Sequence, residues 1–291
     1  MPLFDINMPA NAQLFFNQIM KIAAFDIIET EGMLNSWLKL NATEPLNENF
    51  NKLGFESLWF LNNMGSLMIG FILYGIAIIV LMILEQFTER SEKIKSFYEK
   101  LRSALFYNTL VAIFTESYSL MCVCCMINFT NISFKSFGEA FQTSVNFVFF
   151  VLLFIYPVVI TVHCYRNWSR INEVRKHFES YFEELRIETG PKIMIYNNYF
   201  LFRRLLMAVC VVFGREILFT QIMTKAFSTV ASVIIIGQID VFETRFKRNM
   251  EFMNEMMIML ILYNVICFSS FVPDPIAKYK MGYFCCLIVS L

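Results

Sequence analysis

Stretches of about twenty apolar residues alternate with short charged segments along most of the chain. Because a helix needs about 20 mostly apolar residues to cross roughly 30 Å of hydrocarbon, each long stretch predicts a membrane-spanning helix. The predicted spans are 64–84, 104–127, 140–163, 199–213, 217–239 and 252–271, with a seventh that starts at 281 and is cut short at Leu291. This pattern predicts an all-α, multi-pass transmembrane helical bundle over residues 64–291, preceded by an extracytoplasmic juxtamembrane segment, residues 1–63.

The fourth of these stretches is the least apolar. Only residues 205–213 are continuously apolar. We therefore expect Arg203 and Arg204 at the end of this helix, where long basic side chains reach the lipid head groups.

Basic residues predict the orientation, because loops rich in Lys and Arg stay in the cytoplasm. The segments 85–103, 164–204 and 240–251 carry 16 of them, whereas the segments on the opposite side carry 7. The N-terminus is therefore predicted to lie outside. Three glycosylation triplets, which begin at Asn41, Asn128 and Asn131, fall on this outer side. They make the protein a candidate glycoprotein of the secretory route, and we expect it in the plasma membrane.

Two of the basic connections are predicted to be cytoplasmic and helical, at 85–103 and 164–198. In the second, apolar residues recur at three- and four-residue spacing, and Gly190-Pro191 ends the pattern. They are Ile171, Val174, Phe178, Phe182 and Leu185. The two connections are expected to pack as a hairpin or to lie at the membrane surface. On the outer side, the apolar spacing between Leu14 and Phe25 predicts one amphipathic helix.

Composition supports the membrane class and removes several functions. Hydrophobic residues make up 57% of the 291 residues, charged residues make up 16%, and the net charge is zero. Soluble domains are less apolar and more charged. No basic patch suggests a nucleic-acid partner. No catalytic, cofactor or metal motif is present, and the eight cysteines lie in or beside apolar stretches, so we expect neither an enzyme nor a metal site.

Three ionisable residues within the predicted spans are candidate functional residues, namely Glu116, Lys225 and Glu255. A charge near the bilayer centre costs roughly 2.5–3.5 kcal/mol even on insertion scales, so such residues usually face a partner or water. They indicate either a path for cations or protons, or a Glu116–Lys225 pair that fixes helix packing. Glu255 lies close to the predicted cytoplasmic end of its span.

The helix that carries Lys225 has a polar stripe along one side, expected to point inward. It consists of Thr220, Gln221, Thr224, Ser228, Thr229 and Ser232. The stripe would line a water-filled path or serve as helix–helix contact, which Ser and Thr commonly do in membranes.

Several short segments resemble the C-terminal membrane region of large ciliate surface proteins, a region similar to transient-receptor-potential (TRP) channels. They are Met8-Pro9-Ala10-Asn11-Ala12, Phe25-Asp26-Ile27-Ile28, Leu53-Gly54-Phe55-Glu56-Ser57, Arg203-Arg204-Leu205-Leu206, Phe252-Met253-Asn254-Glu255 and Phe271-Val272-Pro273-Asp274-Pro275. The resemblance implies a longer protein with an ectodomain upstream and further spans downstream.

Three roles remain open at this point. The first is an anchor or signal transmitter within a larger surface protein. The second is a cation-channel subunit, in which case a homo-oligomer is expected; the nine residues 272–280 are too few for a pore helix and a filter. The third is a seven-span receptor, which the outer N-terminus permits although an Asp-Arg-Tyr triplet is missing after the third span.

Overall fold

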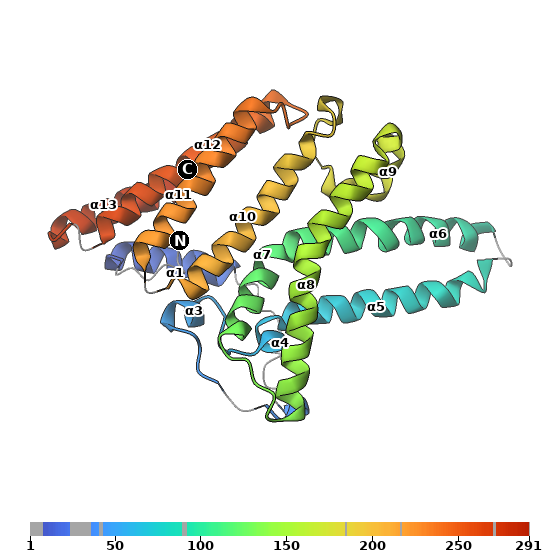
Figure 1. Cartoon of the computed structure of the whole chain (residues 1–291), viewed down its shortest axis with the longest axis horizontal. Coiled ribbons are helices and arrows are strands. Elements are labelled where there is room, and N and C mark those ends of the chain that lie inside the picture. The colour runs from blue at the N-terminus through green and yellow to red at the C-terminus, as the bar shows by residue number, and fades with distance from the viewer. Residues whose placement is uncertain are drawn as a thin grey trace.

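The computed structural model describes residues 8–23, 36–40, 43–88, 92–183, 185–215, 217–269 and 272–290. In these ranges the chain forms helices and turns, with one isolated antiparallel bridge between Leu185 and Phe242. Six of the helices are long and apolar enough to cross a membrane. The predicted all-α, multi-pass membrane fold is confirmed (Figure 1).

The six long helices match the predicted spans in order and approximate position. They are α5 (Gly65–Glu85), α7 (Leu110–Phe129), α8 (Phe137–Arg166), α10 (Ile193–Phe213), α11 (Leu218–Gln238) and α12 (Arg245–Phe268). A further helix, α13 (Pro275–Ser290), covers the seventh apolar stretch but has 16 residues, fewer than the about 20 that a span needs. The seventh span and the outer N-terminus stay predictions.

Capping residues explain why α8 and α12 start before their apolar stretches. Ser136 accepts a hydrogen bond from the backbone N–H of Glu139 at 3.2 Å, and Thr244 accepts one from that of Lys247 at 3.2 Å. Each hydroxyl satisfies an N–H that the helix itself leaves without a partner. The helices therefore include polar first turns that hydropathy alone excludes.

The shorter elements connect these helices. The predicted outer segment contains α1 (Ala10–Ala23), α3 (Glu48–Lys52) and α4 (Phe60–Asn63). The segments in and beside the two predicted cytoplasmic connections contain α6 (Glu92–Ser103), the π-helical turn η2 (Ala104–Thr109), α9 (Ile171–His177) and the 3₁₀ turns η3 (Trp168–Arg170), η4 (Glu179–Tyr181) and η5 (Ile187–Thr189). The amphipathic helix predicted in the outer segment forms as α1.

The long helices pack as an open row rather than as a closed bundle. The main contacts join α8 to α7, α7 to α10, α10 to α11, α11 to α12, α12 to α13 and α13 to α1. Figure 1 shows α10, α11 and α12 lying beside one another in this order. Each helix in the row therefore packs mainly on two neighbours, and α7 with α10 forms its most extensive contact.

Buried apolar side chains form three clusters among the described residues. The largest surrounds α7 and includes Tyr118, Met121 and the buried thiols of Cys122, Cys124 and Cys125. The smallest lies where α1, α12 and α13 meet. All eight cysteines are free thiols, as expected for residues that pack as small apolar groups.

The second predicted connection contributes the other apolar cluster but is not one continuous helix. Its helix α9 ends at His177, and 3₁₀ turns follow. Phe182 and Leu185 are nevertheless buried, against Ile193 and Phe242 among others. The pattern identified the apolar side chains correctly, whereas tertiary contacts replaced the helix: the backbone N–H of Ser180 bonds to the Asn108 side chain at 2.8 Å.

The first connection packs elsewhere than expected. Instead of a hairpin with the second connection, α6 runs back along α5, and Tyr74 of α5 donates a hydrogen bond to the carbonyl of Leu105 at 3.1 Å. The α5–α6 pair extends away from the row (Figure 1).

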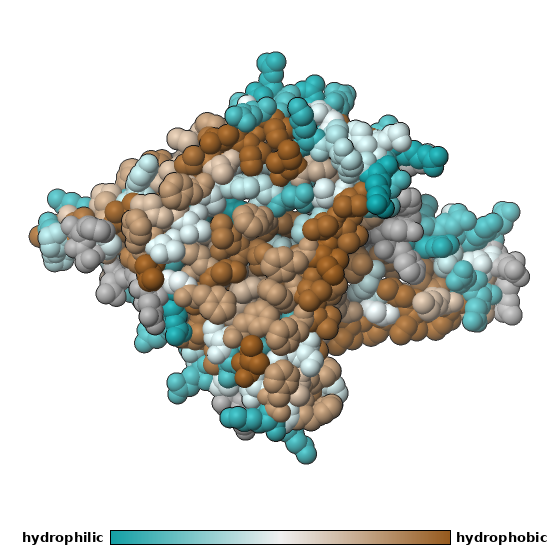
Figure 2. Space-filling model, in the orientation of Figure 1, coloured by the Kyte–Doolittle hydropathy of each residue, from teal (hydrophilic) through white to brown (hydrophobic). Residues whose placement is uncertain are grey.

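Exposed apolar side chains cover much of α5 and α8, including Ile76, Ile83, Val151 and Val158. Figure 2 shows apolar side chains across the middle of one face and polar ones gathered at its margins. Because such broad apolar surfaces are rare on soluble monomers, they mark the area that faces lipid.

Candidate functional site

An ion pair lies in the middle of the row, between α10 and α12. The Arg203 Nη1 atom is 2.5 Å from Oε1 of Glu255 and also donates to the Ser232 hydroxyl of α11 at 2.5 Å. The Arg203 and Glu255 side chains are only 13% and 8% exposed. One guanidinium thus joins three of the long helices, in an interior where buried charges are costly unless they are paired.

The expected position of the two arginines at a helix end is wrong. Because α10 begins at Ile193, Arg203 and Arg204 lie at its middle. Arg204 donates to the carbonyl of Thr115 on α7 at 3.0 Å, and its guanidinium lies 4.1 Å from the centre of the Phe200 ring. The two residues point to opposite neighbours, Arg203 to α11 and α12 and Arg204 to α7. Without them, the predicted cytoplasmic segments still carry the excess of basic residues.

A cavity of about 420 Å³ adjoins the ion pair. Its walls come from α10, α11, α12 and α13, namely from Tyr196, Tyr199, Phe200, Arg203, Ser232, Glu251, Asn254, Glu255, Met257, Ile258, Ile261, Ile288 and Val289. Oε2 of Glu255 is buried and has no hydrogen-bond partner. A buried acceptor of this kind is costly to leave unsatisfied, so it marks a position where a donor would bind.

The other two ionisable candidates do not meet. Glu116 is exposed on α7, whereas Lys225 is half-buried on α11, and within the described ranges no ion pair joins them. The predicted Glu116–Lys225 pair is therefore wrong. The carboxylate that neutralises a cation inside the row is Glu255, and its partner is Arg203.

The polar stripe of α11 is mostly turned toward neighbouring helices. Gln221, Ser228, Thr229 and Ser232 are buried, Thr224 is half-buried and Thr220 is exposed. Gln221 donates to the carbonyl of Gly214 at 3.1 Å, and Tyr199 of α10 donates to the carbonyl of Ser228. These contacts are those of a helix interface, so the stripe serves packing at these positions.

The three glycosylation candidates have different surroundings. Asn128 is completely buried, and its Nδ2 atom, to which a glycan would be attached, donates to the carbonyl of Leu58 at 3.2 Å. The prediction for Asn128 is therefore wrong for the folded chain. Asn131 lies half-buried in the loop before α8, and Asn41 falls outside the described residues.

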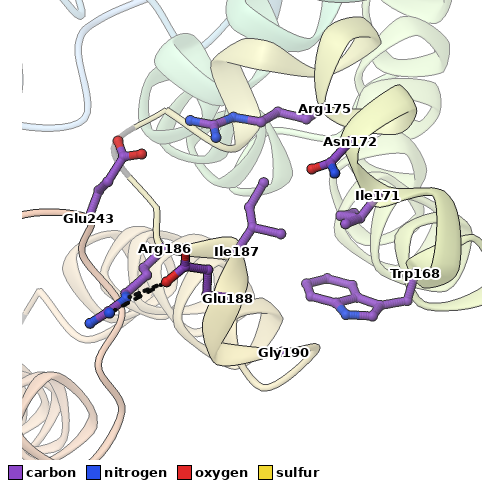
Figure 3. Close-up of a pocket in the computed structure, with 9 residues that line it drawn as sticks. All are labelled: Trp168, Ile171, Asn172, Arg175, Arg186, Ile187, Glu188, Gly190 and Glu243. Carbon is purple, nitrogen blue, oxygen red and sulfur yellow. Dashed lines mark hydrogen bonds and ion pairs between the residues drawn. The ribbon is translucent and has the colours of Figure 1, made fainter.

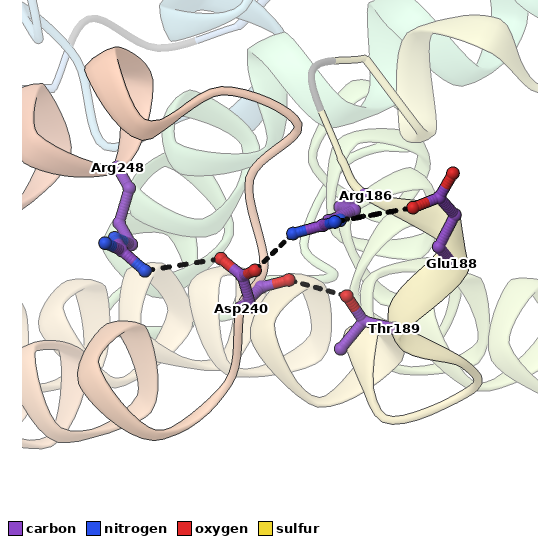
Figure 4. A network of polar contacts seen from close by, with 5 residues as sticks. All are labelled: Arg186, Glu188, Thr189, Asp240 and Arg248. Atoms are coloured by element: carbon purple, nitrogen blue, oxygen red, sulfur yellow. Dashed lines mark hydrogen bonds and ion pairs between the residues drawn. The ribbon is translucent and has the colours of Figure 1, made fainter.

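A polar network joins the second connection to the linker between α11 and α12 (Figure 4). Arg186 pairs with Asp240 and, at 3.4 Å, with Glu188, and Arg248 Nη1 lies 3.4 Å from the Asp240 carboxylate. Thr189 donates to the Asp240 carbonyl at 2.6 Å. The hydrogen bond and charge of Asp240, followed by those of Glu188, raise the pKa of Arg186.

Beside this network lies a second cavity, of about 620 Å³ (Figure 3). It is lined by Trp168, Ile171, Asn172, Arg175, Arg186, Ile187, Glu188, Gly190 and Glu243. Two arginines and two glutamates balance each other in its wall, so the lining favours neither an anion nor a cation. Figure 3 shows Trp168 entering from one side and Glu243 lying on the other.

Sequence reasoning missed Arg203 as the partner of Glu255. A signal was present, because Tyr199 and Arg203 are four residues apart, as are Ser228 and Ser232, and four-residue spacing places side chains on one helix face. In the structure, Tyr199 bonds to Ser228 and Arg203 bonds to Ser232 across the interface between α10 and α11.

Within the described residues, no group of three His, Cys, Asp or Glu is placed to hold a metal ion. No protein-family model, curated protein or solved structure matches this chain. The chain is thus identified by its own features, as a multi-pass helical membrane domain with a buried ion pair in its interior.

Proposed function

We propose that this chain is the TRP-like membrane region of a larger plasma-membrane protein and that it transmits a conformational signal across the membrane. The observation that carries the proposal is the buried Arg203–Glu255 pair, which links α10 and α12 with Ser232 of α11 between them. A region that only anchors a protein needs apolar helices, and it has no use for charges that are costly inside a bilayer. Ionisable residues at this depth usually serve function.

Contacts at both ends of the row supply a route for such a signal. On the predicted outer side, Asn11 of α1 donates to the Tyr279 carbonyl of α13 at 2.9 Å, and α13 packs on α12. At the other end, Arg248 in the first part of α12 contacts Asp240, which holds Arg186 of the second connection. A displacement of α12 would therefore change the contacts made by the outer segment, by α10 and by the second connection.

Hydrogen–deuterium exchange of the complete chain in lipid nanodiscs tests this coupling. Arg203→Met removes the link between α10 and α12, so the linker that holds the second connection should loosen. We expect faster exchange at the amide of Arg186, which donates to the Val241 carbonyl at 2.8 Å. Arg166→Met, at the exposed end of α8, is the matched control and should leave this amide unchanged.

The pattern of exchange distinguishes transmission from local damage. If Arg203→Met speeds exchange only in the turns of α10 and α12 that hold the pair, the signal does not reach the connection and the proposal fails. If exchange also rises around Met121 and Cys122 on α7, the whole fold has loosened. Arg203→Lys, which keeps the positive charge opposite Glu255, should then slow exchange at Arg186 again, and unchanged fast exchange at Arg186 in this variant would contradict the proposed route.

A cation-channel subunit is the second candidate, favoured by one observation. Glu251 and Glu255, one turn apart on α12, both line the 420 Å³ cavity. The described helices form an open row, so this role requires a homo-oligomer in which several copies together surround the pore. Purified full-length chain in planar bilayers should then conduct cations, and Glu251→Gln should lower the unitary conductance. Absence of current from correctly inserted protein would exclude this role.

A further inference from the structure

We propose that the cavity beside the ion pair binds an organic ammonium ion on an apolar body. This proposal depends on the residues that line the cavity and is independent of the proposed role in signal transmission. The ligand class follows from three properties of the site: an unsatisfied buried acceptor, an excess of negative charge, and aromatic and aliphatic walls.

The acceptor is the second oxygen of Glu255. Oε1 is held by Arg203, whereas Oε2 is buried with no donor, although the whole residue is only 6% exposed. An ionised carboxylate accepts hydrogen bonds at both oxygens and cannot donate. The group that completes this site must therefore bring an N–H or O–H, and a charged donor forms the stronger bond.

The charge of the lining favours a cation as that donor. Glu251 lies one turn before Glu255 and faces the same cavity, while Arg203 is the basic residue in its wall. Within the lining, two carboxylates and one guanidinium leave one negative charge. Lys225 lies outside the lining, and its charge interacts with both Arg203 and Glu255. A ligand with one positive charge would neutralise the lining, whereas a neutral alcohol would satisfy Oε2 only.

The remaining walls fit the rest of such a molecule. Tyr196, Tyr199 and Phe200 present aromatic rings, which attract ammonium groups through their π faces. Aliphatic side chains, among them Ile258 and Ile288, also line the cavity and suit an apolar body. The volume of about 420 Å³ lies in the range of about 300–1,000 Å³ typical of small-molecule sites.

A neighbouring cavity offers a way in from the predicted cytoplasmic end. It measures about 210 Å³ and shares Tyr196, Phe200 and Glu251 with the larger one. Glu183 and Lys247 line it farther from the ion pair. Glu251 therefore stands between the two cavities, where a carboxylate would attract an ammonium ion on its path to Glu255.

Native mass spectrometry of the complete chain, released from detergent micelles, tests this proposal with decylammonium as the probe. We expect one decylammonium per chain and no retained decanol, which has the same apolar body without the charge. Glu251→Gln should weaken decylammonium binding about tenfold to hundredfold, because it removes the excess negative charge of the lining. Glu243→Gln, an exposed glutamate outside this cavity, is the control and should bind as the wild type does.

A second pair of variants keeps the test independent of charge and of folding. Ile258→Phe fills the cavity and should abolish binding. Met256→Phe adds the same ring at a residue of α12 that is 44% exposed, and this variant should bind decylammonium as the wild type does. Equal binding of decylammonium by the wild type, Glu251→Gln and Ile258→Phe would overturn the site. Equal retention of decanol and decylammonium would overturn the ligand class. Neither variant removes the Arg203–Glu255 pair, so these outcomes leave the exchange test of the proposed function unaffected.

Discussion

The buried ion pair makes a quantitative prediction about stability. Arg203→Met leaves the Glu255 carboxylate without its donor, in a position where its side chain is only 8% exposed. Removing one partner of a buried pair typically costs about 3–5 kcal/mol, because an uncompensated charge remains. With exposures of 13% and 8%, solvent screens little of this effect. We therefore expect Arg203→Met to lower the free energy of unfolding by about 3–5 kcal/mol.

The double variant separates the free energy of the ion-pair interaction from the effects of replacing each side chain. When Arg203 and Glu255 are both replaced by Met, no buried charge remains, and stability should return to within about 1 kcal/mol of the wild type or exceed it. Ser232 then loses its donor but can bond within its own helix.

Reversible unfolding by sodium dodecyl sulfate in mixed micelles, followed by circular dichroism, measures the free energy of unfolding. The wild type, Arg203→Met, Glu255→Met and the double variant together form a double-mutant cycle. Each single variant leaves one uncompensated charge and should cost about 3–5 kcal/mol, whereas the double variant should cost about 1 kcal/mol at most, so we expect a coupling free energy of about 5–10 kcal/mol. Additive losses from Arg203→Met and Glu255→Met would refute the pairing. Arg166→Met, which changes an exposed arginine at the end of α8, should cost little and serves as the control.

Two further predictions concern the end of the row that is predicted to lie outside. A Cβ atom on Gly138 would lie 2.1 Å from the Leu38 carbonyl oxygen, so Gly138→Ala should cost about 1–3 kcal/mol in the same unfolding assay, whereas Gly75→Ala, with open space around it, should be neutral or slightly stabilising. Glycosidase treatment of protein from a secretory host should release no glycan from Asn128, because its amide is buried; a mass shift abolished by Asn128→Gln but not by Asn131→Gln would contradict that packing.

The sequence predicts the boundaries of α5 and α11 best. The spans predicted at 64–84 and 217–239 match these helices to within one residue at each end, because charged or amide residues directly flank both stretches. In α10, by contrast, Asn197, Arg203 and Arg204 interrupt the apolar pattern as far as the middle of the helix. Their partners lie on other helices, and hydropathy along one segment contains no information about them.

The candidate site was accessible from sequence only in part. Glu255 and Ser232 are identifiable as polar residues in apolar surroundings, which is costly without a partner. That Arg203 is this partner depends on the packing of α10 between α7 and α11, an arrangement that no local pattern encodes. The same reason explains the second connection, where the Ser180–Asn108 contact outweighs a helical repeat.

The contact between α1 and α13 has a consequence for biogenesis. Asn11 and Tyr279, which it brings together, are 268 positions apart in the chain. During synthesis, α1 is made before the six long helices but finds its packing partner only after all of them have been made. Until then its apolar side chains, such as Phe16, lack the cover that Cys285 and Phe268 later provide. Docking of α1 therefore has to wait for the synthesis of α13, and a chaperone that recognises this helix would hold back chains in which the row is still incomplete.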